Sequence, residues 1–186
     1  MKDWLFYPVC TLVVGAIIVF AMSFSTEYDV DPSGGLVVEG EALRNLTAAP
    51  GTLIELDSDL SGSDVYAVMS ANARKEDAPS AGIFVALSPG YQKVFFGHPV
   101  RFSVEARSGT DNGSDSFEFA FFSPKSASGW RKFELTDEFK RYGFEFTPEN
   151  IQIDYRGAYF GIWPDETGDG RTVHVRRMWI ERINPE

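Results

Sequence analysis

The chain holds 186 residues, enough for one ordinary domain and a short additional segment. Its formal net charge of -10 argues against nucleic acid as a partner, because phosphate backbones are bound by a surplus of lysine and arginine. The same acidity disfavours anionic lipid headgroups, and the single cysteine excludes both an intrachain disulfide and a thiolate metal cluster.

Residues 1–24 predict a transmembrane anchor. No charged side chain occurs from Trp4 to Phe24, and a helix of this length spans about 30 Å, the thickness of a hydrocarbon core. Aromatic side chains suited to the two membrane interfaces lie at its ends: Trp4, Tyr7, Phe24 and Tyr28.

The charges and small residues of this segment suggest its orientation in the membrane and a contact with another helix. Lys2 lies on the N-terminal side, which favours a cytoplasmic N-terminus and predicts a single pass through a bacterial cytoplasmic (inner) membrane, with the β domain in the periplasm or outside. Gly15 and Ala16 offer a patch for close contact with another helix. A cleaved signal peptide is the alternative, with Ala21 and Ser23 at its cleavage site.

Residues 25–35 are polar and rich in turn formers, which predicts a juxtamembrane linker, and residues 36–186 are expected to form the extracytoplasmic domain. After Gly51, short apolar runs alternate with Gly, Pro, Asn and Asp, a pattern typical of β proteins. We expect a short strand at 36–39, one helical turn at 42–46, and strands at 52–56, 65–70, 82–87, 93–96, 100–106, 116–122, 130–135, 142–146, 151–154, 158–163 and 172–183.

Several of these strands alternate cleanly between apolar and polar residues. Phe117, Phe119 and Phe121 share one face of their strand, so one side of each strand is expected to pack inward. Two antiparallel sheets around a Phe-rich core follow, which predicts an all-β sandwich of the jelly-roll type. The parity of the last strand changes between Val175 and Met178, and this predicts a β-bulge near Arg176 and Arg177.

Two turns carry residues that adopt positive φ angles. Asp111-Asn112-Gly113 predicts a hairpin between strands 100–107 and 116–122, and Gly168-Asp169-Gly170 predicts a similar turn before the last strand.

The second half of the domain resembles a known group of families. The run Gly129-Trp130-Arg131-Lys132-Phe133-Glu134-Leu135-Thr136, followed by Phe139, Tyr142 and Phe144-Glu145-Phe146-Thr147-Pro148, is similar to the late strands of carbohydrate-binding modules and related galactose-binding-like jelly rolls. Residues 99–106 and 173–183 resemble their central and closing strands. The resemblance covers residues 99–183 and implies a jelly roll, a fold that also serves protein-binding and structural modules.

Carboxylates offer a candidate metal site. Asp57, Asp59 and Asp64 crowd a single loop, and hard cations such as calcium prefer these oxygen ligands. A polar turn explains the same residues without calcium, and no other cofactor is expected. No nucleophile, zinc or phosphate-binding motif occurs, so we expect no enzyme activity.

Exposed aromatic rings are the candidate ligand-binding residues, because their apolar faces stack on the CH groups of sugars. Those near strand ends or loops are Tyr91, Trp130, Tyr155, Tyr159 and Trp163.

Two hypotheses for function remain. In the first, the protein is a non-catalytic accessory or scaffold subunit whose β-sandwich docks on other integral membrane proteins of a larger complex, such as a bacterial respiratory or photosynthetic assembly. In the second, it is a membrane-tethered carbohydrate-binding module for cell-envelope or environmental glycans.

Overall fold

The computed structural model describes residues 35–59, 62, 64–74, 80–150 and 157–183. The predicted anchor, with Gly15, Ala16 and the interface aromatics Trp4, Tyr7, Phe24 and Tyr28, lies outside these residues, as do Tyr155 and the predicted strand 151–154. None of the helices among the described residues has the length and apolar character that crossing a membrane requires.

The elements are strands joined by short turns, with little helix. In chain order they are β1 (Leu36–Glu39), the 3-10 helix η1 (Gly40–Asn45), β2 (Thr47–Ala48), β3 (Thr52–Ser58), β4 (Val65–Asn72), β5 (Ile83–Leu87), α2 (Pro89–Phe95), β6 (Val100–Ser108), β7 (Ser116–Phe122), β8 (Arg131–Glu134), β9 (Lys140–Phe146), β10 (Ala158–Trp163) and β11 (Asp169–Arg182).

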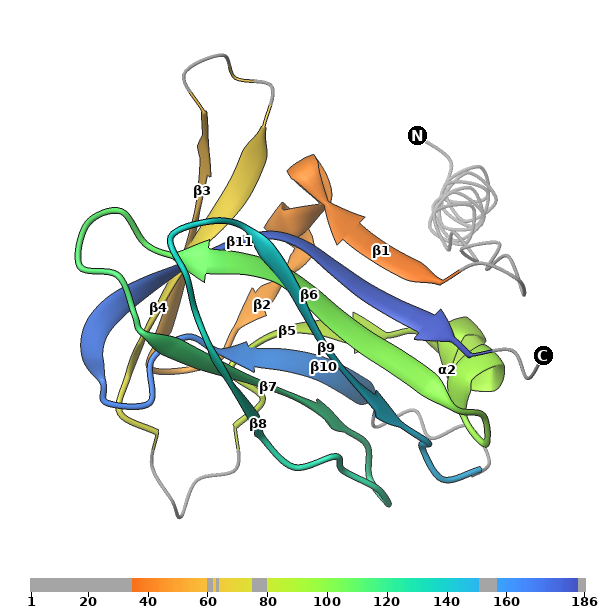
Figure 1. The fold of residues 1–186 in the computed structure, drawn as a ribbon. Coiled ribbons are helices and arrows are strands. Elements are labelled where there is room, and N and C mark those ends of the chain that lie inside the picture. Colours follow the sequence, from red (N-terminus) through yellow and green to blue (C-terminus); the bar gives the residue numbers. More distant parts are fainter. Residues whose placement is uncertain (1–34, 60–61, 63, 75–79, 151–156, 184–186) are drawn as a thin grey trace, which may run out of the picture. The chain divides into compact units, whose positions relative to one another are not determined.

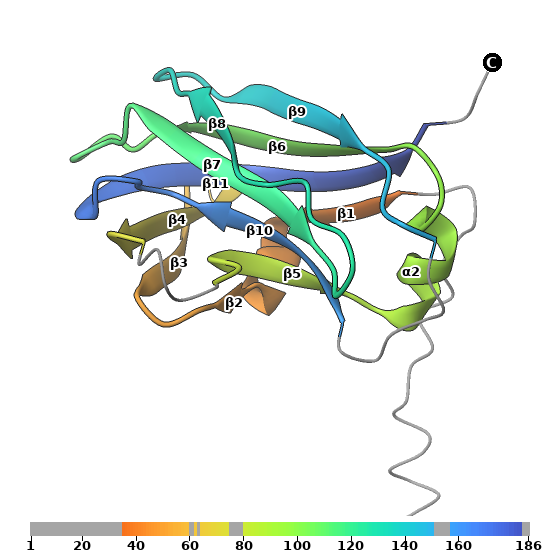
Figure 2. The ribbon, with the colours of Figure 1, turned by 90° about the horizontal axis from the view of Figure 1, so that it is seen from below.

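These strands form two antiparallel sheets that lie face to face (Figures 1 and 2). Sheet A has the order β3-β4-β11-β6-β9, with β1 also paired to β11. Sheet B has the order β2-β5-β10-β7-β8. From β4 to β7 successive strands alternate between the sheets, as in a jelly roll. The predicted all-β sandwich is confirmed.

Phenylalanine rings from both sheets fill the core. Phe102 of sheet A packs on Phe121 and Phe160 of sheet B, with ring centroids 5.1 and 5.2 Å apart. Phe119 similarly meets Phe144 across the sandwich at 5.3 Å. Inward and outward positions alternate along each strand. Once the inward residues are known, the residues on the outer face of each sheet are therefore known as well.

The bulge predicted in the last strand is present in β11. Val175 pairs with Ala106 of β6 but Arg177 pairs with Glu105, so Arg176 is the additional residue. The irregularity allows Val175 and Met178 to point into the core although their parities differ.

Three local predictions are wrong. Residues 93–96, expected as a strand, belong largely to helix α2, which Ser88 precedes and Pro89 begins. The turn at Asp111–Gly113 does place Asn112 at a φ of 56°, but it connects β6 of sheet A to β7 of sheet B and is therefore not a hairpin. The turn before β11 likewise crosses between sheets.

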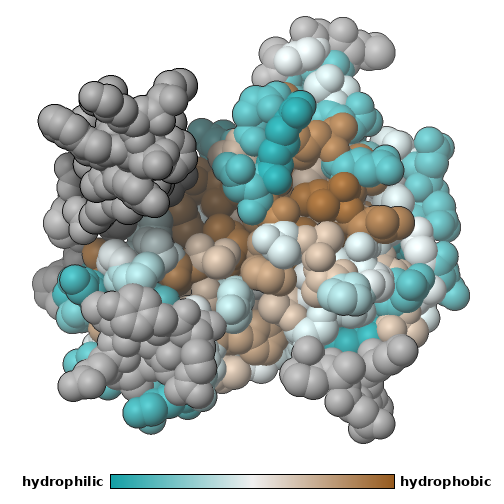
Figure 3. Space-filling view, turned by 180° about the vertical axis from the view of Figure 1, so that it is seen from behind, coloured by the Kyte–Doolittle hydropathy of each residue, from teal (hydrophilic) through white to brown (hydrophobic). Residues whose placement is uncertain are grey.

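One edge of the sandwich is incompletely covered. Between η1 and β3 lies a depression of about 370 Å³ lined by Leu43, Arg44, Ile54 and Leu56, and nearby Leu53 on β3 is 68% exposed. Hydrophobic residues gather on the side of the molecule seen in Figure 3. The edge strand β2 has two residues, so sheet B does not extend far enough to cover all of β3.

Candidate functional site

The outer surface of sheet B collects aromatic side chains from three strands and one loop. In the strand register Tyr159 of β10 lies between Ala86 and Phe122, and Gly161 lies opposite Phe84. The set, called the aromatic face below, consists of Phe84, Phe122, Trp130, Tyr159 and Trp163.

Trp130 lies at the centre of these ring contacts, immediately before β8. Its ring meets Phe122 edge-on at 5.1 Å between centroids and Trp163 edge-on at 6.2 Å. Phe84 and Tyr159 form a second edge-on pair at 5.0 Å. Trp130, Phe122, Tyr159 and Phe84 are each half-buried, so part of each ring surface faces solvent.

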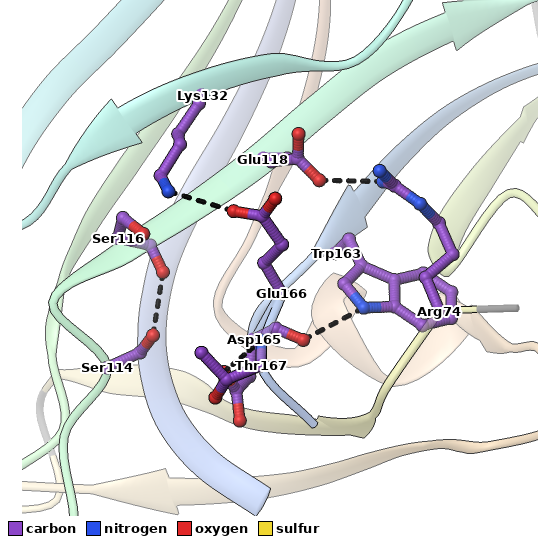
Figure 4. Close-up of polar contacts among 9 residues, drawn as sticks. All are labelled: Arg74, Ser114, Ser116, Glu118, Lys132, Trp163, Asp165, Glu166 and Thr167. Atoms are coloured by element: carbon purple, nitrogen blue, oxygen red, sulfur yellow. Dashed lines mark hydrogen bonds and ion pairs between the residues drawn. The ribbon is translucent and has the colours of Figure 1, made fainter. Parts of the chain in front are cut away.

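Trp163 differs because its side chain is held inside the protein. It is 3% exposed, and its indole Nε1 donates a hydrogen bond to the Asp165 carbonyl at 3.0 Å (Figure 4). This ring therefore contacts Trp130 edge-on and presents little surface of its own.

Asp165 holds the loop that carries this contact. Its carboxylate accepts hydrogen bonds from Thr167 Oγ1 at 2.7 Å and from the backbone N–H groups of Thr167 and Arg171 at 3.0 Å. Burial raises the pKa of Asp165, but the hydrogen bonds from Thr167, Arg171 and Gly168 outweigh it, so the pKa lies below its usual value. The carboxylate is thus a charged structural support for the loop after β10.

Arg74 covers both tryptophans. Its guanidinium carbon lies 4.9 Å from the centre of the Trp130 ring and 5.9 Å from that of Trp163. Its Nη1 donates to Glu118 Oε2 on β7 at 2.6 Å (Figure 4). Cation and ring attract each other, and the ion pair with Glu118 helps to hold the guanidinium over the Trp130 ring.

A second ion pair lies beside the first. Lys132 Nζ on β8 donates to Glu166 Oε2 at 2.8 Å (Figure 4). This bond and the attraction of the opposite charge lower the pKa of Glu166 and raise that of Lys132. Two ion pairs, Arg74–Glu118 and Lys132–Glu166, therefore lie at the aromatic face.

Small residues lie between the rings. Gly161 and Ala120 pair with each other and are buried. A Cβ atom on Gly161 would lie 1.9 Å from the carbonyl oxygen of Ala81. The backbone that leads into β5 therefore packs directly on this part of β10.

The structure brings together three of the predicted ligand-binding residues. Trp130, Tyr159 and Trp163 all belong to the aromatic face. Tyr91 instead lies in α2, where it stacks on Phe95 at 5.8 Å and packs against the core.

Sequence reasoning missed Phe84, Phe122, Arg74 and Glu118. The alternation of β7 contained a signal for two of them: since Phe117, Phe119 and Phe121 point inward, Glu118 and Phe122 must point outward. The sequence around Arg74 contains no such signal, because its contact with Glu118 joins residues 44 positions apart.

The carboxylates proposed for calcium have other partners. Asp57 Oδ2 accepts a hydrogen bond from Tyr66, Asp59 Oδ1 accepts one from the Asp64 backbone, and Asp64 forms an ion pair with Arg176. Within the described part of the chain, no group of three or more His, Cys, Asp or Glu side chains is arranged to hold a metal ion. The calcium prediction gains no support from these contacts.

Comparison with known proteins identifies the fold. No family model matches the sequence, and no curated protein matches it either. Among solved structures, the CBM22-1-CBM22-2 tandem domain of Paenibacillus barcinonensis Xyn10C matches with a TM-score of 0.56 and 10% identity, covering 82% of this chain and 45% of that chain.

Two single modules give similar values over nearly their whole length. The CBM22-1 xylan-binding domain of the same Xyn10C has a TM-score of 0.56 and 9% identity, covering 83% of this chain and 97% of that one. The C-terminal family 22 carbohydrate binding module of Clostridium thermocellum Xyn10B has a TM-score of 0.51 and 14% identity, covering 82% and 94%. The domain thus has the fold of carbohydrate-binding modules, as the sequence resemblance implied.

This finding corrects the first functional hypothesis. The prediction of an accessory or scaffold subunit docked on a membrane complex is wrong, because the structures that resemble this domain are carbohydrate-binding modules. Their fold is the one that the alternative hypothesis, a carbohydrate-binding module, requires.

Proposed function

We propose that the domain is a non-catalytic carbohydrate-binding module that holds a polysaccharide chain against the aromatic face. The observation that carries this proposal is the half-buried Trp130 ring, backed by Trp163 and flanked by Phe122. The fold shared with the CBM22-1 xylan-binding domain supports it, and we take xylan and related β-linked polysaccharides as the first ligands to test.

The chemistry of the face suits a sugar chain. Aromatic rings offer flat apolar surfaces to the CH groups of a pyranose, and hydroxyl groups need partners that both donate and accept. The Arg74–Glu118 and Lys132–Glu166 pairs supply both at the border of the rings.

The same carboxylates argue for binding without hydrolysis. Glycoside hydrolysis needs one carboxylic acid that keeps its proton near neutral pH, which requires a raised pKa. The pKa of Glu166 is instead lowered by Lys132, and Glu118 is held in an ion pair with Arg74. Neither carboxylate is placed to act as the general acid.

The proposal also covers where the protein is located in the cell, and this part of it rests on residues 1–24. Their apolar sequence is the basis for proposing that the module is tethered to a bacterial cytoplasmic membrane and displayed on its outer side. Fractionation with alkaline carbonate tests this: the full-length chain should remain in the membrane pellet, and its release into the supernatant would exclude a spanning anchor.

Affinity electrophoresis of the full-length chain through gels containing soluble xylan tests ligand binding. We expect the wild type to be retarded and Trp130→Ala to lose about tenfold in affinity, since removing a stacking ring costs roughly 1.4 kcal/mol. Phe139→Ala, which removes a half-buried ring outside the aromatic face, is the matched control and should migrate as the wild type does.

Two results would contradict the proposal. One is migration unaffected by xylan, by mixed-linkage glucan and by soluble cellulose derivatives alike. The other is a Trp130→Ala variant retarded as strongly as the wild type.

A further inference from the structure

The outer face of sheet A carries a depression that the proposed function does not use. It has a volume of about 350 Å³ and lies where β6 and β9 pair, with Ser103 opposite Gly143. Gly143 has no side chain and Ser103 is 1% exposed, so these two residues form the bottom of the depression. Arg101, Arg141 and Glu145 rise around it.

A tryptophan lies next to Ser103 on the neighbouring strand β11. Trp179 of β11 pairs with Ser103 on the side away from Gly143, and its ring is half-buried. Arg141 reaches across from β9, with its guanidinium carbon 4.2 Å from the Trp179 ring centre, and pairs with Glu181. The depression is therefore adjoined by an aromatic ring and by an arginine that spans three strands.

This arrangement repeats the chemistry of the aromatic face on the opposite sheet. There, Arg74 lies over Trp130 and pairs with Glu118, next to the small residues Gly161 and Ala120. Here, Arg141 lies over Trp179 and pairs with Glu181, next to Ser103 and Gly143. Each face thus combines a tryptophan with an arginine–glutamate pair.

We propose that the depression between β6 and β9 is a second saccharide-binding site, on the face of the domain opposite the first. The ligand class, a neutral sugar chain, rests on the proposed function and on the charges of this site. Arg101 pairs with Glu145 and Arg141 with Glu181, so the two arginines are balanced by two carboxylates. A balanced surface matches hydroxyl groups, which donate and accept, better than it matches a charged ligand.

The side chains around the depression are free enough to exchange partners. Arg101 and Glu145 are each more than half exposed, at 52% and 57% of their side-chain surface. Exposed ion pairs add little to stability, so ligand hydroxyls can replace part of their contacts at small cost. A guanidinium has five N–H donors, and the Arg101–Glu145 hydrogen bond uses one of them.

Two sites on opposite faces would make the domain bivalent. Each domain can hold two chains, or two segments of one chain, and simultaneous engagement raises the overall affinity without new contacts. The volume of the depression is near the lower end of ligand cavities, roughly 300–1,000 Å³, which fits a short segment of sugar chain.

Calorimetric titration of the full-length chain in detergent with xylohexaose and, separately, cellohexaose tests the proposal through stoichiometry. We expect two ligands per wild-type chain. The double variant Arg101→Ala/Arg141→Ala should bind one, Trp130→Ala should bind two with one of its sites weakened about tenfold, and their combination should retain only that weakened site. Arg44→Ala/Arg182→Ala, which removes two other exposed arginines, is the matched control and should still bind two.

The outcomes separate this inference from the proposed function. If the wild type binds one ligand and Trp130→Ala weakens that binding about tenfold, the second site is refuted and the first stands. If Trp130→Ala leaves binding intact and Arg101→Ala/Arg141→Ala abolishes it, the depression is the site and the aromatic face is not. Absence of binding to either hexasaccharide overturns both. Thermal unfolding of each variant confirms that it is folded.

Discussion

His174 is a buried residue whose ionisation depends on its neighbours. Its ring is 5% exposed, stacks on Tyr66 at 4.8 Å and accepts a hydrogen bond at Nδ1 from Arg107, whose Nε is 3.3 Å away. Burial first and the Arg107 charge second lower the pKa of His174 below 6.5, while Asp57 and Asp111 act in the opposite direction. The folded state therefore favours the neutral ring.

This predicts a loss of stability in acid. Because the pKa is lower in the folded chain than in the unfolded one, the contribution of His174 is fully present above the unfolded value of about 6.5 and is lost as the pH falls toward the folded pKa. We expect the free energy of unfolding of the wild type to approach that of His174→Asn as the pH falls from 7.5 to 5.

Urea unfolding at a series of pH values measures this convergence. A difference between the two proteins that stays constant across the range, or that grows in acid, would show that His174 is not held neutral by its surroundings.

At the scale of elements, periodicity predicted the strands better than their partners. The alternation of Phe117, Phe119 and Phe121 located β7, and the parity change after Val175 located the bulge in β11. The turn at Asn112 has the expected positive φ but joins two sheets. A turn signal is local, whereas the partner of a strand depends on contacts distant in sequence.

Helix α2 shows the same limit. Its apolar residues Val94, Phe95 and Phe96 are adjacent, which favours a strand when periodicity alone is considered. The deciding signal was Ser88-Pro89, an N-cap residue followed by a proline in the first helical turn.

The packing of the β4–β5 connection on β10 gives a prediction for Gly161. The methyl group of Gly161→Ala would lie 1.9 Å from the Ala81 carbonyl oxygen, so the backbone must shift. We expect this variant to lose about 1–3 kcal/mol of unfolding free energy, the usual cost of overpacking.

Ala86→Ser, which adds one atom at an exposed position on neighbouring β5, is the control and should unfold like the wild type. Thermal and urea unfolding give the comparison. A Gly161→Ala variant as stable as the wild type would mean that the Ala81 segment does not pack on β10.

At the scale of the whole molecule, the outer faces of the two sheets both carry a tryptophan beside an arginine–glutamate pair but differ in their other side chains. Sheet B presents the aromatic face, and sheet A presents alternating ion pairs around a depression. The sequence predicted the sandwich, because strand parity is visible in it. It also singled out Trp130, Tyr159 and Trp163 as aromatic residues near strand ends, and the structure brings these three together. The sequence did not reveal that Trp163 is buried beneath Arg74, or that Gly143 and Ser103 meet, since these contacts join distant segments.

Hydrogen–deuterium exchange of the full-length chain with and without xylohexaose tests the central claim most directly, because it locates the bound ligand. We expect slowed exchange in the segments that carry the aromatic face, residues 118–132 and 158–168. Unchanged exchange in both segments, at a ligand concentration that saturates binding, would contradict the claim that the aromatic face holds the sugar chain.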